Sequence, residues 1–108
     1  MNPEKDNLEV ILFSNSSHRF AHPFYNKRIV FTGALSTMTR SEASRKVRYF
    51  GGILQRAVTR ETDFVILGDK RRGKSSKQLM AEQLISLGED IQILLEDDFI
   101  WVLSIVNG

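Results

Sequence analysis

The sequence predicts a single α/β domain in which four short strands form a mostly parallel sheet flanked by three helices. Two observations lead to this fold class. The composition is that of a compact globular protein, because 42% of the 108 residues are hydrophobic and 26% are charged. From Lys27 onward, short apolar runs alternate with segments of helical periodicity, which is typical of strands and helices in turn. Residues 27–108 are therefore expected to form the domain, and residues 1–26 an N-terminal arm or linker.

The first half of the expected domain contains a strand, a helix and a second strand. Residues 29–31 are a short apolar run typical of a buried strand. The segment Thr39-Arg40-Ser41-Glu42 matches a capping box, which begins a helix that ends at Gly51. Residues 53–58 are expected to form the second strand.

The second half contains two further strands, each followed by a helix. Residues 63–68 are apolar on both faces, as expected of a parallel strand that is covered on both sides. A helix follows, with Ser75 or Ser76 as its N-cap. Residues 91–94 form the fourth strand, and the acids of residues 96–98 suit the first turn of the last helix. The apolar residues on these two helices are Leu79, Met80, Leu84 and Leu87, and then Phe99, Val102, Leu103 and Val106.

The net charge of +2 conceals an uneven distribution along the chain. Residues 1–77 hold all fifteen basic residues and seven acids, a net charge of +8, whereas residues 78–108 hold six acids and no base, a net charge of −6. Clustered cations favour an anionic partner, with nucleic acid as the leading candidate. A solvated helix face and a charged loop would give the same distribution without any partner.

Several classes of site are excluded or disfavoured. The chain has no cysteine, which excludes disulfides, thiolate catalysis and cysteine-ligated zinc. His18 and His22 are the only histidines and make a poor zinc site, so no metal and no cofactor are expected. The apolar runs are too short to span a membrane, and the first residues lack the apolar stretch of a secretory signal. We therefore expect an intracellular, cytoplasmic monomer.

A nucleotide-binding motif offers one interpretation of the chain. Residues 68–75 match G-x-x-x-x-G-K-[ST] and lie between a predicted strand and a predicted helix, which is the context that a phosphate-binding loop requires. Its four interior residues, however, are one acid and three large bases, and only 33 residues follow Ser75. An enzyme of that type needs further strands to position metal and water, so a small nucleotide-binding protein stays as an alternative.

A second set of residues offers a different phosphate site. Thr32 and Gly33 follow the first strand, at the carboxyl edge where parallel sheets bind ligands. Arg40 and Lys77 lie at the starts of two helices, where an unpaired cation costs about 0.3 to 1 kcal/mol unless an anion is bound. The remaining bases of the connection before the second helix would follow a DNA backbone: Lys70, Arg71, Arg72 and Lys74.

These features together resemble a BRCT domain. The resemblance covers residues 27 to about 103 and rests on Lys-Arg-Ile-Val-Phe-Thr-Gly at residues 27–33, Gly51-Gly52, and Ser75-Ser76-Lys77. The chain is similar to the single modules of bacterial NAD-dependent DNA ligases, of polymerase III epsilon-type exonuclease proteins and of the replication factor C large subunit. The resemblance implies a four-stranded parallel sheet in the order 2-1-3-4, with the first and third helices on one face and the second on the other.

The resemblance also implies a site and a function. The family's phosphate ligands fall on Thr32, Gly33 and Lys77, and Arg40 matches an additional arginine of the replication factor C module. The chain would then be a non-enzymatic module, without catalytic residues, that binds 5′-phosphorylated DNA ends or strand breaks in replication or repair. A protein-interaction module is the main alternative, and the chain could be part of a longer ligase or exonuclease. Lys74 stays open as an alternative to Lys77, and Leu95 replaces the family's usual serine before the last helix.

Overall fold

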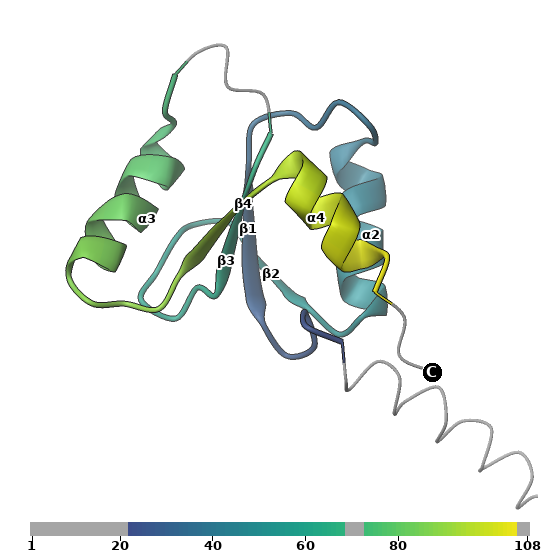
Figure 1. Ribbon diagram of the computed structural model, residues 1–108, viewed down its shortest axis with the longest axis horizontal. Helices are drawn as coiled ribbons and strands as arrows, with labels where there is room; N and C mark the ends of the chain where they lie inside the picture. The colour runs from purple at the N-terminus through teal and green to yellow at the C-terminus, as the bar shows by residue number, and fades with distance from the viewer. Residues whose placement is uncertain (1–21, 69–72, 106–108) are drawn as a thin grey trace, which may run out of the picture.

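Four parallel strands form the centre of the structure, a computed structural model that describes residues 22–68 and 73–105 (Figure 1). The order β2-β1-β3-β4 confirms the expected 2-1-3-4 arrangement. Thr32 pairs in register with Leu67, so β1 and β3 end at the same level of the sheet. The strands are β1 (Arg28–Thr32), β2 (Ile53–Gln55), β3 (Phe64–Leu67) and β4 (Gln92–Leu95); β2 is shorter than the predicted strand over residues 53–58.

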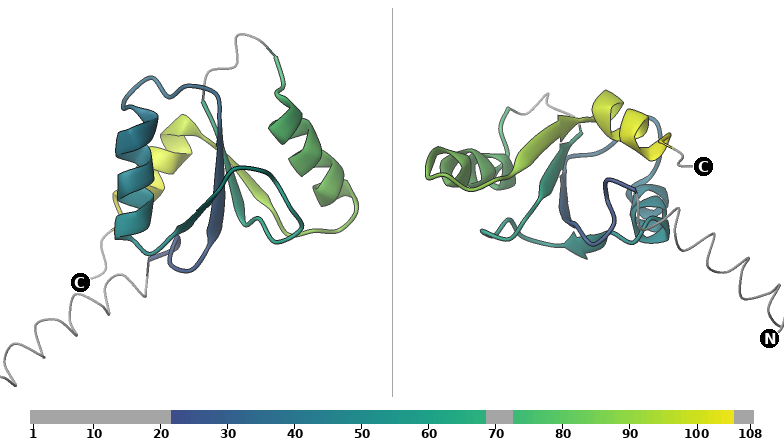
Figure 2. Two further views of the ribbon diagram at one scale, coloured as in Figure 1. Left: turned by 180° about the vertical axis from the view of Figure 1, so that it is seen from behind. Right: turned by 60° about the horizontal axis from the view of Figure 1, so that its bottom comes forward.

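Three helices cover the two faces of the sheet. α2 (Arg40–Tyr49) and α4 (Glu96–Leu103) lie together on one face, and α3 (Ser76–Ser86) lies on the other (Figure 2). The capping box at the start of α2 is confirmed, because Thr39 and Glu42 each accept a hydrogen bond from the other's backbone N–H. Ser75, rather than Ser76, is the N-cap of α3. α4 has no side-chain cap, since its N-cap is Leu95.

The alternation of side chains along the strands divides the core into two clusters. Ile29, Phe31 and Ile66 point to the face covered by α2 and α4, where Val47 and Phe99 meet them. On the opposite face, the cluster under α3 consists of Val30, Val65, Leu67, Ala81, Leu84 and Ile91. Because both faces of β1 and β3 are buried, their sequences are continuous apolar runs rather than alternating ones.

α3 is more exposed than its apolar sequence suggests. Of the four apolar residues noted on it, only Leu84 is buried, together with Ala81. These two are three residues apart and so share one narrow face. Leu79, Met80 and Leu87 fall outside that face and are 52%, 45% and 67% exposed.

The described part of the expected arm packs into the domain. Phe24 is fully buried in the cluster under α2 and α4. His22 stacks on Phe50 with 3.7 Å between the ring centroids, and its Nε2 donates to the carbonyl of Val102 at 3.1 Å. Residues 22–26 therefore belong to the folded domain, with His22 and Phe24 buried, and no pattern in the sequence predicted this. Residues 1–21, 69–72 and 106–108, including Lys70, Arg71, Arg72, His18 and Val106, lie outside the described residues.

Two negative findings concern the described residues alone. None of their helices has the length and apolar character that crossing a membrane would require. No group of three or more histidine, aspartate or glutamate side chains among them could hold a metal ion.

Candidate functional site

The carboxyl end of β1 forms the base of the site. Thr32 ends the strand, and Gly33 turns the chain away with a φ of +83°, a conformation that costs a residue with a Cβ about 1 kcal/mol or more. The N–H of Gly68, just after β3, donates to the carbonyl of Thr32 at 2.8 Å. Any Cβ on Gly68 would collide with the carbonyl of Ala34, so a glycine is needed here for close packing of the two strand ends.

The start of α3 is tied directly to Thr32. The Thr32 hydroxyl, which is largely buried, donates to Ser75 Oγ at 2.6 Å. Ser75 Oγ in turn accepts from the backbone N–H of Gln78 as the N-cap of α3. This chain of hydrogen bonds holds the first turn of α3 against the end of β1, at the upper edge of the sheet in Figure 1.

Two cations converge on the same strand end from different helices. Lys77, in the first turn of α3, donates from Nζ to the carbonyl of Phe31 at 3.2 Å. Arg40, the first residue of α2, donates from Nη2 to the carbonyl of Gly33 at 2.8 Å, and its guanidinium carbon lies 5.1 Å from the centroid of the Phe31 ring. The structure thus brings Thr32, Gly33, Arg40 and Lys77 together.

The charges of these two cations are not balanced by carboxylates. Within residues 22–68 and 73–105, neither Arg40 nor Lys77 forms an ion pair, and each is held by a backbone carbonyl instead. The backbone N–H of Gly33 donates to no acceptor in the same part of the chain. A backbone N–H and two cations around one strand end are donors suited to an anion with several oxygens, and the Thr32 hydroxyl would join them by turning away from Ser75 Oγ.

Lys74 differs from Lys77 in having an acidic partner. Lys74 Nζ lies 3.0 Å from Oε1 of Glu82, two turns along α3. The hydrogen bonds from Lys74 and Gln78 hold the pKa of the Glu82 carboxyl below its usual value. In the motif at residues 68–75, Gly68, Lys74 and Ser75 therefore all have internal structural contacts.

Glu96 is a further residue of the site. From the sequence, Glu96 was expected only to interact favourably with the dipole of the last helix. Its carboxylate, at the start of α4, accepts hydrogen bonds from the backbone N–H and hydroxyl groups of Ser36 and Thr37, at 2.6 to 3.1 Å. Burial raises the pKa of the Glu96 carboxyl, but these four donors outweigh burial and leave it below its usual value. Glu96 thereby fixes the connection between Gly33 and α2. No local pattern indicates this contact, because the partners are about 60 residues apart.

Comparisons with known proteins agree with this architecture. The sequence model of the BRCA1 C Terminus (BRCT) domain matches residues 20–89. A DNA ligase of Lysinibacillus sphaericus is 38% identical over 85 residues, which are 79% of this chain and 12% of the ligase. A DNA ligase of Geotalea uraniireducens is 35% identical over 109 residues, covering 94% of this chain and 15% of the ligase. The chain thus spans only a small part of the ligases that it matches.

A solved structure shows the same fold. The C-terminal BRCT domain of human XRCC1 has a TM-score of 0.56 with this chain at 18% identity, and the match covers 75% of each chain. The sheet order, the arrangement of helices and the similarity to one region of DNA ligases lead to one conclusion: the chain belongs to the BRCT domain family.

Proposed function

We propose that this domain is a non-enzymatic module that binds the 5′-phosphate of a DNA end or strand break during replication or repair. The observation that carries the proposal is the convergence of Arg40 and Lys77 on the end of β1 without an acidic partner among the described residues. Membership of the BRCT family and similarity to DNA ligases support a binding role in replication or repair.

The phosphate would take the place of the carbonyl groups that the two cations now contact. Thr32 would turn its hydroxyl from Ser75 Oγ to the phosphate, Gly33 would contribute its backbone N–H, and Lys77 and Arg40 would supply charge. A carbonyl oxygen is neutral and a phosphate oxygen carries negative charge, so exchanging one for the other adds a Coulomb attraction for both cations. Contact with the Phe31 ring and the Gly33 carbonyl orients the Arg40 guanidinium in advance.

Lys77 is the better candidate for the main lysine ligand. Lys74 is already paired with Glu82, whereas Lys77 lies beside Thr32 and, among the described residues, contacts only a carbonyl. Lys74, with Lys70, Arg71 and Arg72, would instead contact the neighbouring DNA backbone. None of these contacts reads a base, so binding should be independent of sequence.

The relatives named above are ligases, but the module itself is not proposed to join DNA. The chain spans 15% or less of each ligase described above, and the site offers hydrogen-bond donors rather than a pair of catalytic groups. Its role would be to hold a DNA end for an enzymatic partner or for another part of a longer protein.

A chemical-shift titration with a 5′-phosphorylated duplex tests where the ligand binds. We expect the largest shifts at the amides of Thr32, Gly33 and the first turn of α3, and small shifts near Leu87 at the far end of that helix. ATP and GTP are the controls for the nucleotide alternative. Shifts caused by nucleotide but not by DNA, or DNA-induced shifts confined to other surfaces, would contradict the proposal.

A further inference from the structure

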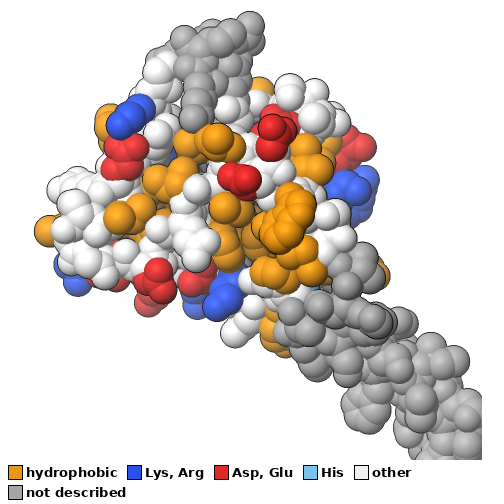
Figure 3. All heavy atoms as spheres, viewed as in Figure 1, with side chains coloured by type: hydrophobic (Ala, Val, Ile, Leu, Met, Phe, Trp, Pro, Cys, Tyr) orange, Lys and Arg blue, Asp and Glu red, His pale blue; other side chains and the backbone are white. Residues whose placement is uncertain are grey.

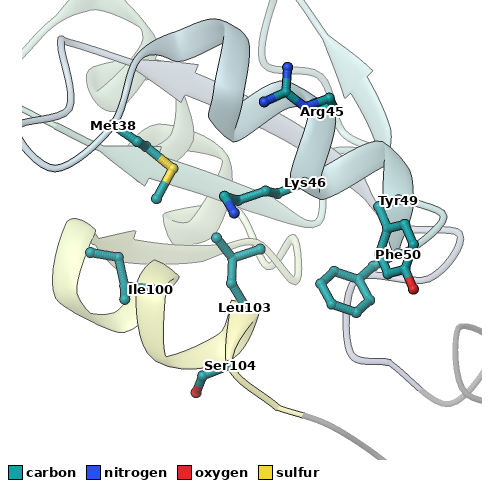
Figure 4. A pocket seen from close by; sticks show the side chains of 8 residues that line it. All are labelled: Met38, Arg45, Lys46, Tyr49, Phe50, Ile100, Leu103 and Ser104. Atoms are coloured by element: carbon teal, nitrogen blue, oxygen red, sulfur yellow. The ribbon is translucent and has the colours of Figure 1, made fainter.

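A groove lies between α2 and α4. It has a volume of about 580 Å³, and Figure 4 shows Met38 and Lys46 reaching from the α2 side toward Ile100 and Leu103 of α4. Its apolar lining consists of Met38, Tyr49, Phe50, Ile100 and Leu103. Tyr49 is 64% exposed. Trp101, the neighbour of Ile100 on α4, is 67% exposed. Figure 3 shows hydrophobic side chains gathered over α4, and such a concentration indicates a surface that another segment covers.

The rim of the groove is positively charged. Arg45 and Lys46 line it from α2. Neither forms an ion pair with an acidic side chain in the described ranges. A segment that suits this groove therefore needs apolar side chains for the floor and a carboxylate for the rim.

The chain reaches the domain at one end of this groove. His22, where the described residues begin, stacks on Phe50, which lines the groove. Its Nε2 also donates to the carbonyl of Val102, one residue before the groove residue Leu103. Whatever precedes residue 22 is therefore joined to the domain next to the groove.

The segment upstream of His22 has the composition that the groove requires. Residues 8–13, Leu-Glu-Val-Ile-Leu-Phe, are the one apolar run in the first 21 residues, and Glu9 lies within it. Residues 1–13 hold three acids and one base. The eight residues between this run and His22 span at most about 27 Å when extended, which is enough to reach any part of a groove between two short helices.

We propose that residues 8–13 dock in the groove between α2 and α4 of their own chain, with apolar side chains on its floor and Glu9 beside Arg45 and Lys46. Docking covers apolar surface that would otherwise face water. It also means that a protein partner using this groove must first displace the chain's own segment. The proposal does not depend on the phosphate site, so either one can fail alone.

Disulfide trapping in the full chain tests the proposal, because the natural sequence has no cysteine. A variant with Leu12→Cys and Ile100→Cys is compared with a control carrying Leu12→Cys and Leu87→Cys, since Leu87 is exposed beside α3 on the other side of the sheet. We expect the groove pair to form an intramolecular disulfide more than about tenfold faster than the control pair, because docking raises the local concentration of the thiol. Adding Ile11→Asp should remove this advantage.

Two outcomes of the trapping experiment would overturn the proposal. Equal rates for both pairs would show that the segment does not dock, and disulfide-linked dimers as the main product would show that a second copy occupies the groove. An independent measurement needs no change in the folded domain: Ile11→Asp alone should shift the amide resonances of Met38, Phe50 and Leu103. Unchanged resonances at these three positions would also contradict docking.

Discussion

Lys77 and Lys74 provide a matched pair of residues in which only one is proposed to bind phosphate. They lie three residues apart at the start of α3, but Lys74 pairs with Glu82 whereas Lys77 contacts the carbonyl of Phe31. Lys77→Gln should weaken binding to a 5′-phosphorylated duplex by about tenfold or more, because a hydrogen bond to a charged group contributes roughly 1.5 to 3 kcal/mol. Lys74→Gln should have a much smaller effect.

Titrations of both variants at the same salt concentration measure the difference. Unfolding free energies serve as the control, since Lys74 is exposed just before α3, Lys77 is only half-buried, and neither variant should be strongly destabilised. If Lys74→Gln lost more affinity than Lys77→Gln, the assignment of the two lysines would have to be reversed.

His22 makes the stability of the fold sensitive to mild acid. Burial lowers the pKa of His22 more than the hydrogen bond to Val102 raises it, so the folded-state pKa lies below the ordinary value of 6.5. Nδ1 accepts from the N–H of Phe24 at 3.0 Å, and protonation of this atom would remove that acceptor. The unfolded chain therefore binds the proton more readily, and the unfolding free energy should fall as the pH drops below 6.5 toward the folded-state pKa.

Urea unfolding at pH 7.5 and pH 5.5 checks this expectation. His22→Gln should flatten the pH dependence, and His18→Gln, which alters the other histidine, should leave it unchanged. A pH dependence that survives His22→Gln but disappears with His18→Gln would exclude His22 as its source.

At the scale of elements, α4 organises the connection between β1 and α2. The Glu96 carboxylate accepts from both residues of the Ser36-Thr37 pair, and a glutamine cannot replace it because its amide nitrogen carries no lone pair for these donors. Glu96→Gln should lower the unfolding free energy by about 1 to 3 kcal/mol. Asp97→Asn is the matched control in the same helical turn. It should lower the unfolding free energy less than Glu96→Gln, because it removes only a favourable interaction with the helix dipole.

The same contact has a predictable response to pH. The folded-state pKa of Glu96 lies below 4.5. The ionised carboxylate therefore contributes fully to the unfolding free energy above pH 4.5, and this contribution is lost as the pH falls through the folded-state pKa. The difference in unfolding free energy between the natural chain and Glu96→Gln should therefore shrink in acid. A constant difference between pH 6 and pH 3 would contradict the role of the ionised carboxylate.

Helices and strands could be predicted where the sequence pattern that marks them spans only a few neighbouring residues. The capping box joins Thr39 to Glu42, and the Ser75 cap joins to Gln78, so each pattern lies within four residues of sequence. The apolar runs of β1 and β3 marked strands buried on both faces. α3 was harder to interpret, since several of its apolar side chains are exposed and composition alone does not show which face meets the sheet.

At the scale of the whole molecule, the residues alone predicted a parallel sheet, and the strand order came with the family resemblance. Contacts between residues that are distant in the sequence could not be predicted. Glu96 lies about 60 residues from Ser36, and His22 lies 80 residues from Val102. His22 and Phe24 flank a proline, and residues 1–26 hold both prolines and the polar cluster at residues 14–17, which favoured an arm over a core. The four phosphate candidates were found because each follows a strand or begins a helix, where parallel sheets place their ligands.

The uneven charge along the chain predicts strong salt dependence of DNA binding. Each phosphate that a lysine or arginine neutralises releases counterions, so the logarithm of the affinity should fall linearly with the logarithm of the salt concentration. Lys77→Gln should reduce this slope by about 1, since it removes one phosphate contact. Tight binding to DNA that does not change with salt would be incompatible with phosphate recognition.

Recognition of the 5′-phosphate is tested with two duplexes that differ only at one 5′ end, one phosphorylated and one with a free hydroxyl. Binding to both is measured at the same salt concentration with the full chain. We expect the phosphorylated duplex to bind more tightly by about tenfold or more, because only it presents the terminal phosphate to Thr32, Gly33, Arg40 and Lys77. Equal affinity for the two duplexes would contradict recognition of the 5′-phosphate.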